Sequence, residues 1–469
     1  MAGDRLQFQV VLTGAFSTGT PLRVRLAEYA SFQDAVGERL EGDASGGWNR
    51  EGARWRGVSS YGKGAGGFAN LIPLVLVQRE GEALAAAIER AGGGEGGAPL
   101  AAADGADGWS WELGEAKVQI YDLGVGVTAT TYDVTAPAGM AAGEAAQAVY
   151  AATELDRERE GGLPPLSAAQ EAVARESVEA FRTAAAACWE GELPDPWLKP
   201  RAGDDGSRWP GDDAERGRLL WLHPAYVVEG EPGASASALA ELARPFRSTY
   251  SSSVEYPDGL FVPGVQKSAI VTRGGFELKR EPLGLIALNW AYYALFMEMD
   301  RGLLAGLDDG RWEEPASLRE LEREAERTYR DFLRFREAKA RLDSALTGLG
   351  PRQANLWAPI AEVTRFEELL AAVEDKLEVL RGVAEGRLSE ATARSARRSR
   401  NFLTALTALT VVTMVVTVVD SIAGARADTL ERDELRAVFA VAAFLVAAAL
   451  YLFAERDLRW WRRRRPDRD

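Results

Sequence analysis

Few residues of this chain could carry acid–base or nucleophilic chemistry, because it contains one histidine, His223, and one cysteine, Cys188. One residue of each kind provides neither a histidine–cysteine zinc site nor an intrachain disulfide. A nucleophile with an imidazole base would have to use His223. His223 lies in an apolar, strand-like run, 219–228, and Cys188 in an alanine-rich segment, so both are typical of a core. We predict that the chain is not an enzyme, and leave open a mechanism based on carboxylates alone.

A glycine-rich segment, 57–64, is one residue short of a phosphate-binding P-loop. That loop needs Ser or Thr after its lysine to reach Mg²⁺, and here Gly64 follows Lys63. The residues before it do not resemble a buried strand. We therefore expect no nucleotide site in this segment.

Threonines recur in an apolar run near the C-terminus. Thr410, Thr413, Thr417 and Asp420 are three or four residues apart, and at ~100° per residue they fall within an arc of about 80° on a helix. A polar face that ends in an acid can line a cation path once several copies surround an axis, so these are the pore-lining candidates. The alternative is structural, because threonine hydroxyls also bond to their own helix or to a neighbouring helix.

Two uncharged apolar runs, 402–419 and 437–454, lie close together in the C-terminal part. At ~1.5 Å per residue each covers about 27 Å, close to the thickness of the hydrocarbon core. They predict a two-helix transmembrane hairpin; the alternative is a pair of buried core helices.

Arginines flank this hairpin on both sides, while the loop between the runs holds five acids and three bases. By the positive-inside rule both termini are cytoplasmic and the protein is a multi-pass protein of the inner (cytoplasmic) membrane. The lipid bilayer is thus an expected partner. The expected membrane-interface residues are Arg397, Arg398, Arg400, Trp460, Trp461, Arg462 and Arg463.

Two heptad patterns precede the hairpin, at 318–349 and 363–384. They predict a helical coiled-coil stalk. The two helices pair either as an antiparallel hairpin within one subunit or also between subunits of a homo-oligomer. The second helix has no proline after residue 360 and is expected to run into the first membrane span.

The remaining N-terminal part mixes strands and helices separated by glycine-rich segments, which predicts an α+β cytosolic region. Ser167 and Gln170 are expected to form a capping box at the start of a helix. The expected strands are 6–13, 71–78, 116–122, 125–134, 218–229 and 269–273. The expected domains are an acidic α+β domain (1–160), a second α+β region (161–310), the stalk (311–400), the hairpin (401–456) and a basic cytoplasmic tail (457–469).

The order of these elements resembles the CorA family of divalent-cation channels, and the segment 409–424, LTVVTMVVTVVDSIAG, is similar to that family's first membrane helix. The resemblance implies ion transport and makes a divalent cation the one candidate bound ion; no other cofactor is identified, and no metal ligand is assigned. Two departures matter. The sequence has 425–429, ARADT, where the family's Gly-Met-Asn signature belongs, and it lacks the proline within the first span. Both put Mg²⁺ selectivity in doubt.

The overall charge limits the partners. With 55 Lys and Arg against 70 Asp and Glu, the net charge of −15 argues against nucleic-acid binding. The sequence predicts an oligomeric membrane protein with a cytosolic sensor body, in the manner of a CorA-like channel without the Gly-Met-Asn filter, and with a cytosolic ligand or protein partner that the sequence does not identify. The alternative is a membrane-anchored bacterial conflict-system or signalling component whose hairpin tethers it or perturbs the membrane.

Overall fold

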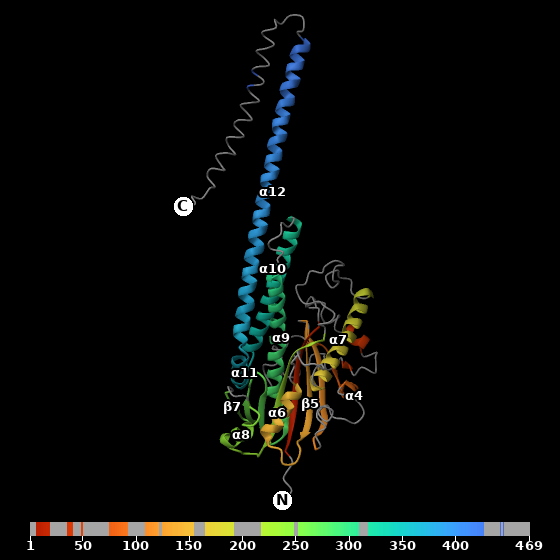
Figure 1. Ribbon diagram of the computed structural model, residues 1–469, viewed down its shortest axis with the longest axis vertical. Coiled ribbons are helices and arrows are strands. Elements are labelled where there is room, and N and C mark those ends of the chain that lie inside the picture. Colours follow the sequence, from red (N-terminus) through yellow and green to blue (C-terminus); the bar gives the residue numbers. More distant parts are fainter. Residues whose placement is uncertain are drawn as a thin grey trace. The chain divides into compact units, whose positions relative to one another are not determined.

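A computed structural model describes residues 6–18, 35–40, 48–49, 75–91, 108–121, 124–153, 165–191, 217–247, 252–308, 318–425, 441 and 444. By compactness the chain divides into two units. Unit 1 comprises residues 1–315 and 326–382, and unit 2 comprises 316–325 and 383–469. The sheet lies entirely in unit 1 (Figure 1).

The centre of unit 1 is a nine-stranded mixed sheet with the order β2-β3-β4-β5-β1-β6-β9-β8-β7. All neighbours are antiparallel except β6 and β9, which are parallel. The sheet is continuous across residue 160, because β1 pairs with β5 on one side and β6 on the other. The strands are β1 Gln7–Ser17, β2 Trp48–Asn49, β3 Val75–Glu80, β4 Ser110–Tyr121, β5 Val125–Thr135, β6 Leu219–Gly230, β7 Val254–Tyr256, β8 Gly259–Val262 and β9 Ser268–Arg273.

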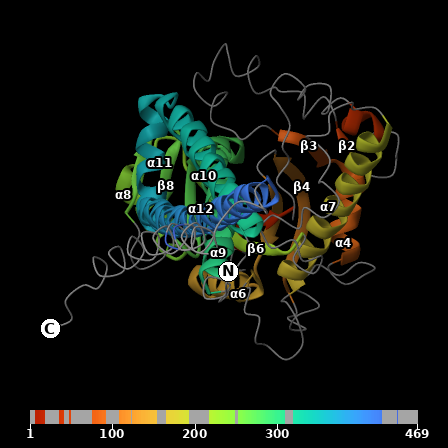
Figure 2. The same ribbon diagram turned by 90° about the horizontal axis from the view of Figure 1, so that it is seen from above.

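Both faces of the sheet are buried, because successive side chains of a strand point to opposite faces. On β1, Val10 and Leu12 belong to one apolar cluster, and Val11 and Ala15 belong to the other. The first cluster includes α4, α6, α7 and α8, and the second includes α9, α10, α11 and the start of α12. Figure 2 shows α4 and α7 on one side of the sheet and α9, α10 and α11 on the other. The helices are α4 Glu82–Ala91, α6 Ala142–Thr153, α7 Pro165–Gly191, α8 Ala236–Ala243, α9 Arg280–Asp308, α10 Leu318–Thr347, α11 Pro351–Thr364 and α12 Phe366–Ala425, with a 3₁₀ turn at Phe276–Lys279.

The heptad positions within unit 1 are filled inside one chain. Leu370, Val373, Leu377 and Leu380 of α12 are almost completely buried in the apolar cluster that also holds Phe335 and Leu342 of α10. The two helices run antiparallel in this unit, since Phe332 lies under Arg381 at 5.4 Å, whereas Lys339 bonds to Glu374 at 2.7 Å. Of the two pairings that the heptads allowed, the antiparallel pair within one subunit is therefore present in the structure.

α12 is one helix of 60 residues that passes from unit 1 into unit 2. It begins at Phe366, within the predicted heptad pattern 363–384, because Arg365 adopts a left-handed conformation with φ 52° and caps α11. The helix then continues through the first apolar run to Ala425 without a break.

The expected capping box of α7 is wrong. The helix begins at Pro165, so Ser167 and Gln170 already lie within it. Ser167 Oγ donates to the carbonyl of Thr153 at 3.0 Å, and Gln170 Nε2 donates to Thr130 Oγ1 at 2.8 Å. Both side chains therefore tie α7 to neighbouring elements, because they face the buried side of the helix.

Candidate functional site

His223 is held in the core of unit 1. Its Nε2 shares a hydrogen bond of 2.9 Å with Ser268 Oγ, and both residues are 1% exposed. Ser268 Oγ also accepts from the backbone N–H of Gly264 at 3.3 Å. The ring lies 5.4 Å from that of Trp290, and burial lowers the pKa of His223 to about 4, so the imidazole is neutral near pH 7. These hydrogen bonds connect β6 to the start of β9 and to the turn before it. The buried imidazole is not accessible to a substrate, as expected for a structural histidine.

Cys188 and the P-loop-like segment 57–64 were also considered from the sequence as places for chemistry. Cys188 is buried on α7, as a core residue would be. The P-loop-like segment 57–64 lies outside the described residues. Among the described residues, no group of three or more His, Cys, Asp or Glu side chains is placed to hold a metal ion.

A cluster that sequence reasoning missed surrounds Arg352 of α11. Its guanidinium pairs with Asp258 in the turn between β7 and β8, and its Nε lies 2.5 Å from Glu281 of α9. The guanidinium also lies over the ring of Tyr256, 5.6 Å from its centre. Because Asp258 and Arg352 are 94 positions apart in the sequence, no local pattern predicts their contact. The cluster fixes α11 to the sheet, and so sets the place where α12 begins.

The strongest candidate for a functional surface is the apolar stretch of α12 in unit 2. This helix is long and apolar enough to cross a membrane, by length and composition, and none of its apolar window is buried. Large side chains along it are exposed, among them Phe402 and Met414 at 68% each. Of the second apolar run, 437–454, the structure describes only Val441 and Phe444, which are also exposed.

The threonines of this stretch bond to their own helix. The hydroxyls of Thr407, Thr410, Thr413 and Thr417 each donate to the carbonyl four residues earlier, at 2.7–2.9 Å. Each hydroxyl proton is thereby used, while the threonine oxygens keep lone pairs that can accept. Bonding of the threonines to their own helix, the alternative to a pore lining, is thus observed. The face of α12 that carries these threonines therefore presents acceptor oxygens and methyl groups. Asp420 lies within α12, but its side chain is outside the described set.

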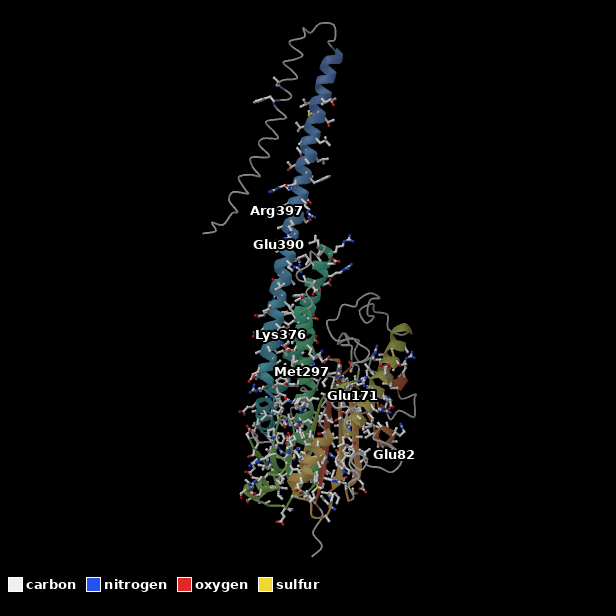
Figure 3. The ribbon with its side chains drawn as sticks, in the orientation of Figure 1. Glu82, Glu171, Met297, Lys376, Glu390 and Arg397 are labelled. Atoms are coloured by element: carbon white, nitrogen blue, oxygen red, sulfur yellow. The ribbon has the colours of Figure 1, made fainter. Side chains whose placement is uncertain are left out.

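The predicted membrane-interface residues are described only before the first run. Arg398 and Arg400 are exposed on α12, and Arg397 lies beside them. Arg394 pairs with Glu390 one turn earlier, at 2.6 Å, with both side chains exposed. Glu390 and Arg397 are labelled on α12 in Figure 3. Trp460, Trp461, Arg462 and Arg463 lie outside the described residues. The described arginines thus form a basic collar immediately before the apolar stretch.

Comparison with known proteins finds no matching family model, no matching curated protein and no matching solved structure. The resemblance to the CorA family therefore rests on the sequence features alone. The exposed stretch of α12 and its flanks are the features of the described chain that bear on function.

Proposed function

We propose that the chain is an oligomeric membrane protein whose α+β body is held at the cytoplasmic face of the inner membrane by a two-helix hairpin, 401–456. The observation that carries this proposal is the apolar window of α12, none of which is buried. Burying one leucine or phenylalanine side chain gains about 1.5–3 kcal/mol, so lipid around this stretch provides a large driving force. Arginines on both sides of the hairpin support a cytoplasmic position for both termini.

Extraction and labelling of the full chain test this topology. After Cys188→Ser, which removes the one native thiol, single cysteines are introduced by Asp428→Cys in the loop and Asp467→Cys in the tail. We expect the chain to resist alkaline carbonate, residue 428 to react with an impermeant maleimide added outside the cell, and residue 467 to react only in opened membranes. Release by carbonate would contradict anchoring, and outside labelling of residue 467 would contradict the orientation.

Cation conduction by assembled copies is a second candidate function, supported by the alignment of three threonines on one face of α12. The hydrogen bonds of these threonines within the helix are compatible with it. Because Thr410, Thr413 and Thr417 donate their protons to their own helix, only acceptor lone pairs remain outward, and acceptor oxygens bind cations. This agrees with the resemblance to the CorA family. Without the Gly-Met-Asn signature, we expect poor preference for Mg²⁺ over other cations. If the hairpin only tethers the body, the alternative hypothesis of a membrane-anchored conflict-system or signalling component is favoured instead.

Ion flux into liposomes that contain the purified full chain separates these two functions. Thr413→Val keeps the shape of the side chain and removes its outward acceptor, and Asp420→Asn removes a negative charge. Both are expected to lower cation flux several-fold, whereas the control Thr404→Val, about 90° or more away from this face, is expected to leave it unchanged. Flux that is absent, or insensitive to both changes, would contradict conduction and leave anchoring standing.

A further inference from the structure

A second heptad pattern follows the buried one on α12, and it lies on exposed residues of unit 2. Its members are separated alternately by four and three residues, and each is exposed. We call this set the open seam: Thr392, Ala396, Ser399, Leu403, Leu406, Thr410, Thr413 and Thr417. In heptad notation these residues occupy positions a and d, the positions through which parallel helices pack.

Charge is sorted around the helix in relation to the open seam. No seam residue between Thr392 and Thr417 is charged, whereas Arg387 and Arg394 occupy position f, Arg397 position b, Arg398 position c and Arg400 position e. Positions b, c and f point away from a helix partner, and position e borders the contact. The exposed ion pair of Arg394 with Glu390 links positions f and b on the outer side. A contact between identical helices through the outer side would place arginines against arginines, but a contact through the open seam would not.

The side chains of the open seam are suited to close packing in lipid. Small residues let two helix backbones approach, and this favours association of membrane helices. The seam threonines add no unpaired donor to such a contact, because their hydroxyls donate within the helix. Leu403 and Leu406, which are 59% and 48% exposed, provide the larger apolar contacts.

The earlier heptads of α12 cannot serve the same purpose. Leu370, Val373, Leu377 and Leu380 are buried against elements of their own chain, so they are not available to a second copy. From the sequence, a contact between subunits through those heptads was one of two alternatives, the other being a pair of helices within one subunit. The structure leaves the open seam as the heptad face of α12 with no partner among the described residues.

We propose that copies of this chain associate through the open seam, α12 against α12 and in parallel, with the arginines of positions b, c and f directed outward. The parallel direction rests on the proposed function, because anchoring places every copy in the same orientation across the membrane. Where the seam enters the bilayer, the contact brings Thr410, Thr413 and Thr417 of each copy towards a common axis.

Cysteine cross-linking of the full chain in its native membrane tests this contact. In the Cys188→Ser background, Ser399→Cys, Leu406→Cys and Thr413→Cys sample the open seam, and Ala405→Cys, Ala408→Cys and Val411→Cys sample the outer side at similar depth. Identical a or d positions of parallel helices face each other, so catalysed oxidation is expected to give several-fold more disulfide-linked dimer at the seam positions.

Two outcomes would overturn the proposal. Equal dimer yields on both sides would indicate random collision, and no dimer at the seam in chains that resist carbonate would mean that the second apolar run of the same chain occupies it. In the latter case anchoring stands and only the contact fails, whereas release by carbonate would remove both. As a further check, Ser399→Trp should block close approach and lower cross-linking through Leu406→Cys, while Asn401→Trp, at outer position f, should not.

Discussion

The side chains of unit 1 find their packing and hydrogen-bond partners elsewhere in the fold, whereas those of the open seam of α12 do not, within the part of the chain that the structure describes. In unit 1, apolar residues of α12 pack against α9 and α10, and polar residues find partners on distant elements, as Lys339 does with Glu374 and Arg352 with Asp258. Along residues 392–417, apolar side chains are exposed and the threonines bond to their own helix. The difference indicates that unit 1 is complete within one chain, whereas the open seam requires a cover from outside it, which we propose to be lipid and a second copy.

The largest expected effect comes from placing a charge among the buried heptad positions of α12 in unit 1, which we call the buried seam. Leu377 is 1% exposed, so Leu377→Asp should lower the free energy of unfolding of the body by at least about 3 kcal/mol, through a lost apolar contact and a buried carboxylate. Chemical denaturation of the full chain in detergent, followed by tryptophan fluorescence, measures it. Ser399→Asp, on the open seam, is the matched control and should leave unfolding of the body unchanged; equal losses would contradict the contrast between the two seams.

The next effect depends on pH and follows from burial of His223. Burial lowers the pKa of His223 from 6.5 to about 4 in the folded protein. Between these values the unfolded chain binds the proton and the folded chain does not, so stability is lost as pH falls from about 6.5 to 4. The loss is about 3 kcal/mol. His223→Gln does not titrate, so wild type should lose this amount relative to the variant over that window. Parallel stability curves would contradict the buried, neutral imidazole.

The smallest effect is expected at Glu374, which binds Lys339 and Arg336 at 2.7 and 3.1 Å near the surface. Glu374→Gln should cost about 0.2–1 kcal/mol at neutral pH, the range of partly exposed ion pairs. The hydrogen bond from Lys339 lowers the pKa of Glu374, so its contribution is present above the ordinary carboxyl pKa and is lost as pH falls through the lower folded value. The difference between wild type and variant should therefore vanish in acid. Glu378→Gln, exposed one turn later on α12, serves as the control.

Much of the body could be predicted from local patterns. Expected strands overlap β1, β3, β4, β5, β6 and β9, because each is a run of β-forming residues bounded by turns. The strands β2, β7 and β8 were missed, since two, three and four residues are too short to show a period. The presence of β7 and β8 is explained by tertiary pairing, because β8 pairs with β9 and β7 pairs with β8.

The functional surface was only partly predictable, because a heptad reports a packed face and not its partner. Leu370 and Leu377 carry the expected pattern and are buried, but their partners are α9, α10 and α11 of the same chain. The threonine spacing pointed to one face of a helix, and it did not show that each hydroxyl returns to the carbonyl four residues before it. The Arg352 cluster needed the fold itself, because its members come from α11, α9 and the turn between β7 and β8.

The edges of the sheet carry a consequence for how this protein can meet other proteins. In the described part of the chain the outermost strands are β2, with two residues, and β7, with three. A short edge strand exposes few free backbone donors and acceptors, so it is a poor template for the addition of a strand from another chain. The longest strands, β1, β4, β5 and β6, lie inside the sheet between other strands. The two outermost strands of the described sheet are therefore poor sites for edge-to-edge aggregation when many copies come close together.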